Sequence, residues 1–168
     1  MYQEKKELER LTKKTIKANR SHYLAYSERL PIILNKLGFI YDSSVIESKN
    51  RLGNNAMGYF LLDNVIEFPI TIMDAYLFTY MHITEDKIIN TFKYTLDYAR
   101  KHNKTFNIIT IVWHANVLKM KGGRKYKDIL EYLSCQKDVK LVNGIEIAKI
   151  VNANLRKLVG ATPLSLNA

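Results

Sequence analysis

A histidine that directly follows the most apolar segment of the chain is the first candidate for chemistry. His114 comes after Trp113 at the end of the apolar run 106–112. In α/β proteins the ends of buried parallel strands carry catalytic groups, because the strand is rigid and its end opens to solvent. We therefore expect His114 to transfer protons as an acid or a base.

Polar residues follow two other apolar segments and could act together with this histidine. Arg20 follows a short strand-like step at residues 16–18, and Asp42 follows residues 39–41. Because parallel strands end at one edge of a sheet, these groups are expected to converge with His114 in one pocket. A carboxylate stabilises a protonated imidazole and fixes its tautomer, and a guanidinium orients a carboxylate or binds an anion. Taken singly, each residue also fits a role without chemistry. His114 fits a hydrogen-bonded surface histidine, Asp42 a turn or helix cap, and Arg20 a surface cation.

The elements that position these groups are predicted from helical and strand-like patterns, which alternate along the chain. Helical patterns cover residues 3–14, 28–36, 84–102, 125–134 and 144–158. Short apolar segments typical of strands cover residues 16–18, 39–41, 59–62, 65–73, 106–112 and 139–142, and Pro69 interrupts the fourth. Continuous apolar strands between helices predict an α/β fold with parallel strands covered by helices. Residues 1–168 are expected to form a single domain with about half the elements of a full (β/α) barrel.

The composition is that of an ordinary globular protein with a basic surface. The 26 Lys and Arg residues outnumber the 16 Asp and Glu residues, so the formal net charge is +10. The basic residues form small scattered clusters, which favours a solvated lysine-rich surface over a nucleic-acid-binding face. Cys135 is the single cysteine, which excludes an intrachain disulfide, and no segment is apolar enough to predict a membrane span. A start without an apolar leader predicts a cytoplasmic protein.

Four ordered segments of the chain carry the motifs of a known enzyme family. They are Arg20-Ser21-His22-Tyr23-Leu24, Leu37-Gly38-Phe39-Ile40-Tyr41-Asp42-Ser43-Ser44, Phe68-Pro69-Ile70-Thr71-Ile72-Met73-Asp74 and Thr110-Ile111-Val112-Trp113-His114. In this order they resemble the later half of polysaccharide deacetylases, the carbohydrate esterase family 4 or NodB homology group. The resemblance covers about residues 4–150. It implies a partial, distorted (β/α) barrel of the polysaccharide deacetylase type and a metal-dependent hydrolase that removes N- or O-acetyl groups from sugars.

The resemblance also implies roles for individual residues. By motif position, His114 is the general acid that protonates the leaving amine, and Asp42 is the carboxylate that tunes it. Arg20 corresponds to the residue that holds the family's catalytic aspartate. Positions implied for substrate binding at the rim of the site are Tyr23, Trp113, Arg51 and Asp74.

The motifs that hold the family's metal and catalytic base do not occur in this sequence. Family members carry an early Asp-Asp motif and a His-x-x-x-His helix. Here no two of the four histidines are three or four residues apart, so one helix cannot present two imidazoles to one metal. The chain thus resembles only the C-terminal half of the domain. We expect no metal site in this chain and no deacetylation by it alone, and a zinc-like divalent metal only in the complete domain.

The origin and the function of such a half domain leave alternatives open. The chain is either a truncated reading frame or a working subunit that pairs with a separately encoded N-terminal half, because half a barrel leaves open sheet edges. The expected ligand is an acetylated carbohydrate. A noncatalytic carbohydrate-binding or assembly protein would keep the rim but need neither metal nor base. A basic nucleic-acid-binding module would require a steep salt dependence of binding, and no nucleic-acid motif supports it.

Overall fold

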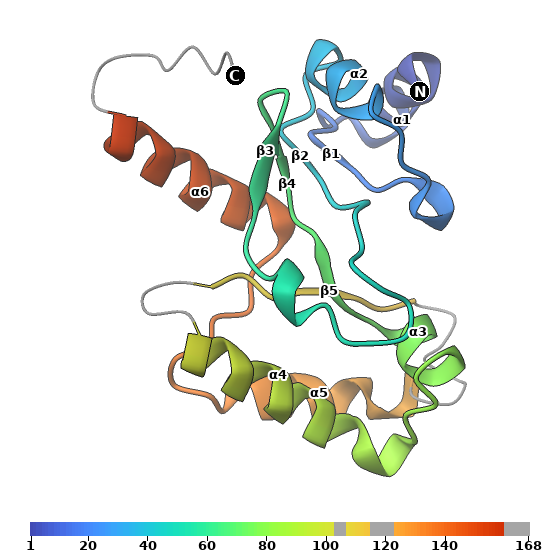
Figure 1. Cartoon of the computed structure of the whole chain (residues 1–168). Coiled ribbons are helices and arrows are strands. Elements are labelled where there is room, and N and C mark those ends of the chain that lie inside the picture. Colours follow the sequence, from blue (N-terminus) through green and yellow to red (C-terminus); the bar gives the residue numbers. More distant parts are fainter. Residues whose placement is uncertain (103–106, 115–122, 160–168) are drawn as a thin grey trace.

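The structure, a computed structural model, describes residues 1–102, 107–114 and 123–159. Its α-helices are α1 (Tyr2–Thr12), α2 (Leu30–Lys36), α3 (Asp74–Thr79), α4 (Ile88–His102), α5 (Tyr126–Ser134) and α6 (Gly144–Val159). Its strands are β1 (Ala18–Asn19), β2 (Tyr41–Asp42), β3 (Phe60–Leu62), β4 (Val65–Glu67), β5 (Ile70–Met73) and β6 (Thr110–Val112). Helices and mainly parallel strands alternate along the chain (Figure 1), which confirms the expected α/β character.

The larger sheet has four short strands in the order β1, β2, β4, β3. The first three run parallel, and their register pairs Asn19 with Asp42 and Asp42 with Glu67. β3 runs antiparallel to β4 because Asp63 and Asn64, with φ of 49° and 64°, turn the chain back as in a tight hairpin. Three parallel strands therefore end side by side, with an amide and two carboxyl groups in one row.

The smaller sheet consists of β5 and β6, which run parallel. Pro69 lies between β4 and β5 and cannot donate to a ladder, so the predicted strand at residues 65–73 divides between the two sheets. One parallel bridge, from Ile46 to Ile70, connects β5 to the segment that follows β2.

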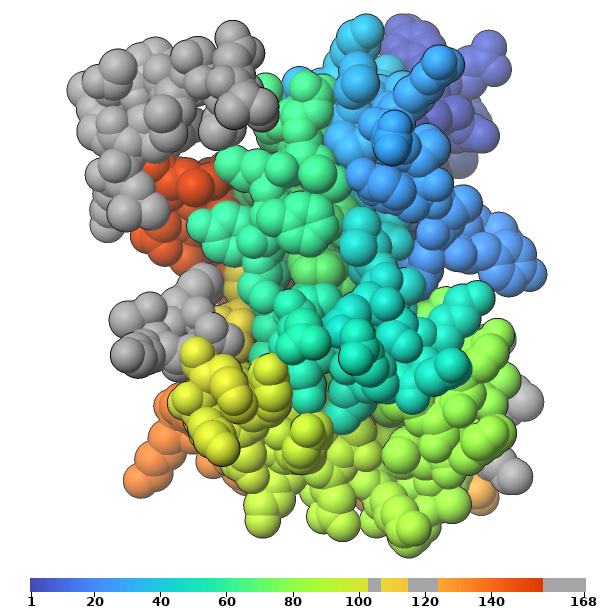
Figure 2. All heavy atoms as spheres, viewed as in Figure 1, coloured from blue at the N-terminus to red at the C-terminus, as the bar shows by residue number. Residues whose placement is uncertain are grey.

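Several expectations about the sheet need correction. The described strands form two sheets, and the barrel implied by the resemblance is not confirmed. Residues 139–142 form no strand, because an apolar tetrapeptide becomes a strand only where a neighbouring edge supplies hydrogen bonds. The antiparallel hairpin of β3 and β4 departs from the all-parallel expectation. In Figure 2 the segment around residues 45–60 covers the front of the molecule between the N-terminal region and α4.

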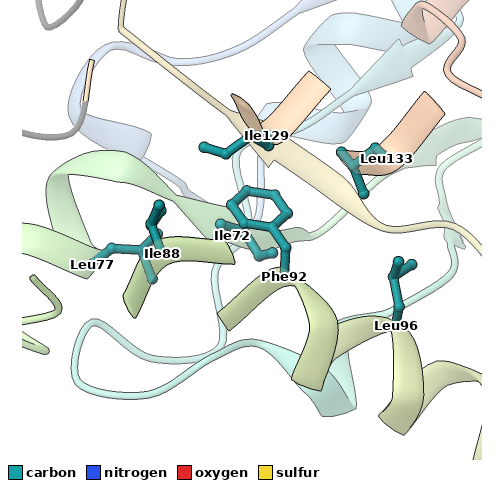
Figure 3. Packing of buried hydrophobic residues seen from close by; sticks show 7 residues of the cluster. All are labelled: Ile72, Leu77, Ile88, Phe92, Leu96, Ile129 and Leu133. Atoms are coloured by element: carbon teal, nitrogen blue, oxygen red, sulfur yellow. The ribbon is translucent and has the colours of Figure 1, made fainter. Parts of the chain in front are cut away.

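The main hydrophobic cluster lies between the smaller sheet and the helices α3, α4 and α5. Figure 3 shows the Phe92 ring reaching from α4 toward Ile129 of α5 and Ile72 of β5. The helical pattern predicted over residues 84–102 is confirmed in α4, whose buried residues include Ile88, Phe92, Leu96 and Ala99. The helices of this cluster pack against β5 and β6 and so support the ends of the two strands.

Two smaller clusters cover the faces of the larger sheet. Ile147, Ala148 and Val151 of α6 pack against Ile66 of β4 and Phe68. Leu30 and Leu34 of α2 pack against Val65 of β4 and Phe39. Since Val65 and Ile66 are adjacent in one strand, their side chains point to opposite faces, and α2 and α6 therefore cover opposite sides of the sheet.

Candidate active site

The parallel register of β5 and β6 brings an aspartate and a histidine together. Met73 lies opposite Val112 at the ends of the two strands. Asp74 follows Met73 directly and begins α3, and His114 lies two residues beyond Val112. The two side chains are 40 residues apart in sequence, and the pairing of their strands places them in contact.

Asp74 contacts His114 at two points. Its Oδ1 accepts a hydrogen bond from the ring Nδ1 of His114 at 2.6 Å, and its Oδ2 accepts one from the backbone nitrogen of His114 at 2.7 Å. The backbone nitrogen of Ala75 donates to Oδ1 at 2.7 Å. Asp74 is 0% exposed, so these donors provide the partners that a buried carboxylate requires.

The contact fixes which ring nitrogen of His114 is free to act. Because a carboxylate only accepts, Nδ1 carries a proton, and Nε2 is left to take up or release one. The His114 side chain is 44% exposed, in contrast to its buried partner. The pair therefore has the geometry of an accessible imidazole oriented by a buried carboxylate, which suits general acid–base catalysis.

Trp113 lies among aromatic rings below the pair. Its ring centroid is 6.2 Å from that of Phe78, 6.3 Å from that of Phe92 and 5.8 Å from that of Tyr126. Its indole nitrogen is buried and has no hydrogen-bond partner among the described residues. Trp113 thus packs against rings of α3, α4 and α5, and its expected role in substrate binding stays a prediction.

Asp42 and Arg20 lie in a second polar cluster, at the ends of β1, β2 and β4. Asp42 Oδ1 accepts hydrogen bonds from Asn19 Nδ2 and Ser44 Oγ, both at 2.9 Å. Arg20 donates through Nε to the Ser43 carbonyl at 3.0 Å and through Nη2 to Ser43 Oγ at 2.9 Å. Arg20 and Asp42 thus belong to one cluster, in which Arg20 is bonded to Ser43.

The structure gives His114 a carboxylate partner other than the predicted Asp42. Among the described residues, no hydrogen bond or ion pair joins the Asp42 cluster to His114, whose carboxylate partner is Asp74. The reason is topological, because β2 pairs with β1 and β4 while β6 pairs only with β5. Strand ends in two different sheets do not share the single rim that one continuous parallel sheet would provide.

A cavity of about 820 Å³ lies between the two sheets. Its walls include Arg20 and Ser43 at one end, Ile72 and residues 107–111 along one side, and residues 138–144 along another. Neither Asp74 nor His114 is part of its lining. The cavity and the aspartate–histidine pair are therefore separate features.

Comparison with solved structures shows that the fold of this chain is similar to a known one. No protein-family model matches the chain, and neither does any curated protein sequence. A crystal structure from Mycobacterium smegmatis, described as a “putative polysaccharide deacetylase”, superimposes with a TM-score of 0.67 at 18% sequence identity. The match covers 98% of this chain but 57% of that chain. The fold is deacetylase-like.

Within this deacetylase-like fold, two predicted rim residues lie away from the aspartate–histidine pair. Tyr23 is 89% exposed, sits in the short helical turn His22–Leu24 and has a φ of 54°. Arg51 pairs with Glu47 at 2.5 Å, and the same carboxylate oxygen accepts a hydrogen bond from Asn55 at 3.1 Å. The described hydrogen bonds and ion pairs connect neither residue to His114, so their expected roles at the rim stay predictions.

Among residues 1–102, 107–114 and 123–159, no three His, Cys, Asp or Glu side chains are grouped so that they could hold a metal ion. In the same ranges no helix is long and apolar enough to cross a membrane.

Glu67 also belongs to the Asp42 cluster and was not predicted from the sequence. Glu67 Oε1 accepts hydrogen bonds from the backbone nitrogens of Ser44 at 3.0 Å and Val45 at 2.9 Å. The residue is 1% exposed. A signal was present in the sequence, since an acidic residue inside the apolar stretch Val65-Ile66-Glu67-Phe68 has no solvated face on a strand covered from both sides.

Proposed function

We propose that this chain provides the proton-transfer part of a polysaccharide-deacetylase-type active centre that acts on acetylated sugars. The observation that carries the proposal is the two-point contact of buried Asp74 with exposed His114. The deacetylase-like fold supports the choice of this reaction over other acid–base chemistry. The proposed role of His114 is the one that its motif position implied, with Asp74 in the place expected for Asp42.

The proposed step is protonation of the group that leaves the acetyl carbon. When water has added to the carbonyl carbon of an acetamide, the carbon–nitrogen bond breaks and the nitrogen must gain a proton. His114 Nε2 donates that proton, and the Asp74 carboxylate stabilises the imidazolium that exists before the transfer. For an O-acetyl group the proton goes to the leaving sugar oxygen in the same way.

In the proposal, residues outside this chain supply the metal site and the base of the reaction. The described residues include no group of side chains that could hold a metal ion, and the step proposed for this chain uses only its own side chains. The chain spans 57% of the solved structure that it matches. In the proposal, the segment that activates water lies outside this chain, and the chain alone releases no acetate.

The proposal is tested by comparing the chain alone with the chain joined to an N-terminal segment that carries Asp-Asp and His-x-x-x-His motifs. Acetate release from an N-acetylated oligosaccharide is measured with and without zinc. We expect release only from the joined form with zinc, and a loss of roughly 10²–10⁴-fold for His114→Ala, which is the usual contribution of a positioned general acid.

The matched control is His102→Ala, because His102 is an exposed histidine on α4 that contacts Tyr98. This variant should keep full activity. Acetate release by the chain alone, or a joined form that His114→Ala leaves unaffected, would overturn the proposal. Saturable sugar binding without any acetate release in the joined form would favour the noncatalytic carbohydrate-binding alternative.

A further inference from the structure

One buried carboxyl oxygen of the larger sheet has no protein partner. Glu67 is 1% exposed, and its Oε1 is satisfied by the backbone nitrogens of Ser44 and Val45. Its Oε2 is buried and accepts no hydrogen bond from the described residues. An ionised oxygen in this position would forfeit its hydration without any compensating donor. A protonated Oε2 would instead become a donor, and it needs an acceptor nearby.

The Asp42 carboxyl is the acceptor within reach. The parallel register of β2 and β4 places Asp42 next to Glu67, and their side chains are close enough to hydrogen bond. Asp42 is 3% exposed, and its Oδ1 already accepts from Asn19 and Ser44. Two buried carboxylates side by side cannot both ionise without a large electrostatic cost. A single proton shared by the two carboxyl groups gives Glu67 Oε2 a hydrogen-bond partner and removes the repulsion between two negative charges.

The charged surroundings also favour a single negative charge. Among the described residues, Arg20, Tyr26 and Asp42 interact electrostatically with Glu67 from neighbouring elements. Only Arg20 among them is a cation, and it donates to Ser43 rather than to either carboxylate. Burial, together with the charge and hydrogen bond of Asp42, raises the pKa of Glu67 to about 7.

The same cluster holds the segment that follows β1. Ser44 Oγ donates to Asp42 and accepts a hydrogen bond from the backbone nitrogen of Ser21 at 2.9 Å. Two residues later Tyr23 and Leu24 have φ values of 54° and 55°, a left-handed conformation that costs energy in residues with bulky side chains. Such a backbone persists only where neighbouring contacts hold it, and the Ser21–Ser44–Asp42 chain is one such contact.

We propose that Asp42 and Glu67 share one proton, and that this carboxyl pair positions the Arg20–Leu24 segment at the end of β1. Loss of the proton puts a second charge into the buried cluster, pushes the Asp42 and Glu67 carboxylates apart and weakens the hold of Ser44 on Ser21. Glu67 is a positioning residue in this account. The inference does not depend on the proposed deacetylase role.

The test is amide hydrogen exchange of the whole chain between pH 6 and pH 8, corrected for the intrinsic pH dependence of exchange. In the wild type we expect protection of residues 18–25 to fall about tenfold between pH 6 and pH 8, with most of the fall below pH 7, because a single group with a folded-state pKa near 7 ionises. In Glu67→Gln the protection should stay constant within about twofold. The Gln amide can still accept from Ser44 and Val45 and donate to Asp42, as protonated Glu67 does.

The matched control is Glu131→Gln, which changes an exposed carboxyl on α5 and should retain the pH dependence of the wild type. A second measurement uses the unmodified sequence, so that a folding defect of the variant cannot obscure the result. Carbon-13 NMR of labelled glutamate carboxyls should show one group that titrates near pH 7. A chain in which every glutamate is ionised at pH 5.5, or a Glu67→Gln variant with unchanged pH dependence, would overturn the inference.

Discussion

The Asp74 carboxylate accepts hydrogen bonds from both the backbone nitrogen and the ring Nδ1 of His114. Ring rotation would break one of these bonds, and movement of the strand end would break the other. The imidazole is therefore held by contacts on two rigid elements, β6 and the start of α3. This arrangement meets the requirement that a catalytic group be oriented by a second group before substrate arrives.

Replacement of Asp74 by asparagine should destabilise the fold. Asn has one acceptor oxygen where Asp74 has two, and its amide hydrogens would face N–H groups of His114 or Ala75. A buried donor left without an acceptor costs about 1–3 kcal/mol, so we expect the free energy of unfolding to fall by about that amount. Urea denaturation followed by far-UV circular dichroism measures it.

The control for this variant is Asp97→Asn, an exposed aspartate on α4 that pairs with Arg100 at 3.3 Å. Exposed pairs of this kind contribute about 0–1 kcal/mol, so the control should change the unfolding midpoint little. If both variants lose the same stability, the burial and pairing assigned to Asp74 are incorrect.

Glu67→Gln should change how stability depends on pH. The carboxyl of Glu67 has a pKa near 4.5 when unfolded and about 7 when folded, so the folded state retains a proton that the unfolded chain releases. This contribution is fully present below pH 4.5 and is lost as the pH rises through 7. Relative to the wild type, Glu67→Gln should gain roughly 1–3 kcal/mol between pH 5 and pH 8. Thermal unfolding at several pH values measures this gain, and a constant difference between the two proteins would refute it.

Phe92→Ala should be among the more damaging core substitutions. Phe92 is 1% exposed and lies at the centre of the cluster that supports β5 and β6. Truncation of a buried phenylalanine costs about 3–5 kcal/mol, because the cavity it leaves collapses only in part. Tyr94→Ala, two residues away at a position 57% exposed, is the matched control and should cost far less. Equal midpoints in guanidinium would contradict the assigned packing of α4.

Gly144→Ala should test the contact of α6 with the larger sheet. An added Cβ at Gly144 would overlap the ring and hydroxyl of Tyr41. Alanine is otherwise the better helix former. A loss of about 1–3 kcal/mol in the free energy of unfolding would therefore show that the overlap with Tyr41 outweighs the gain in helix propensity. Tyr41→Ala in the same chain should recover most of that loss. Additive effects of the two substitutions in a double-mutant cycle would show that the residues do not touch.

The sequence allowed most helices of this fold to be predicted, because their apolar residues follow a helical period. The helices α4 and α2 are two examples, with Pro31 in the first turn of α2. Strands were harder to predict, since an apolar tetrapeptide pairs only if another edge lies beside it. Residues 139–142 have the composition of a strand but find no partner among the described strands.

The site was predictable in its residues but not in its pairing. His114, Asp74, Asp42 and Arg20 were all singled out from the sequence, yet the carboxylate beside His114 was taken to be Asp42. The distinction depends on which strands are neighbours, and Pro69 divides the sheet between the two candidates. The role of Glu67 depends on the same long-range pairing, since only the β2–β4 register places its carboxyl next to that of Asp42.

Trp113 is the only tryptophan of the chain, and it lies one residue from His114 among rings contributed by α3, α4 and α5. Its fluorescence is therefore a built-in reporter of this one region. A protonated histidine quenches indole emission, so a ligand that changes the charge or position of His114 should change the signal without any added dye. Loosening of the helical layer should shift the emission to longer wavelengths, whereas the larger sheet and its carboxyl pair should leave the signal unchanged.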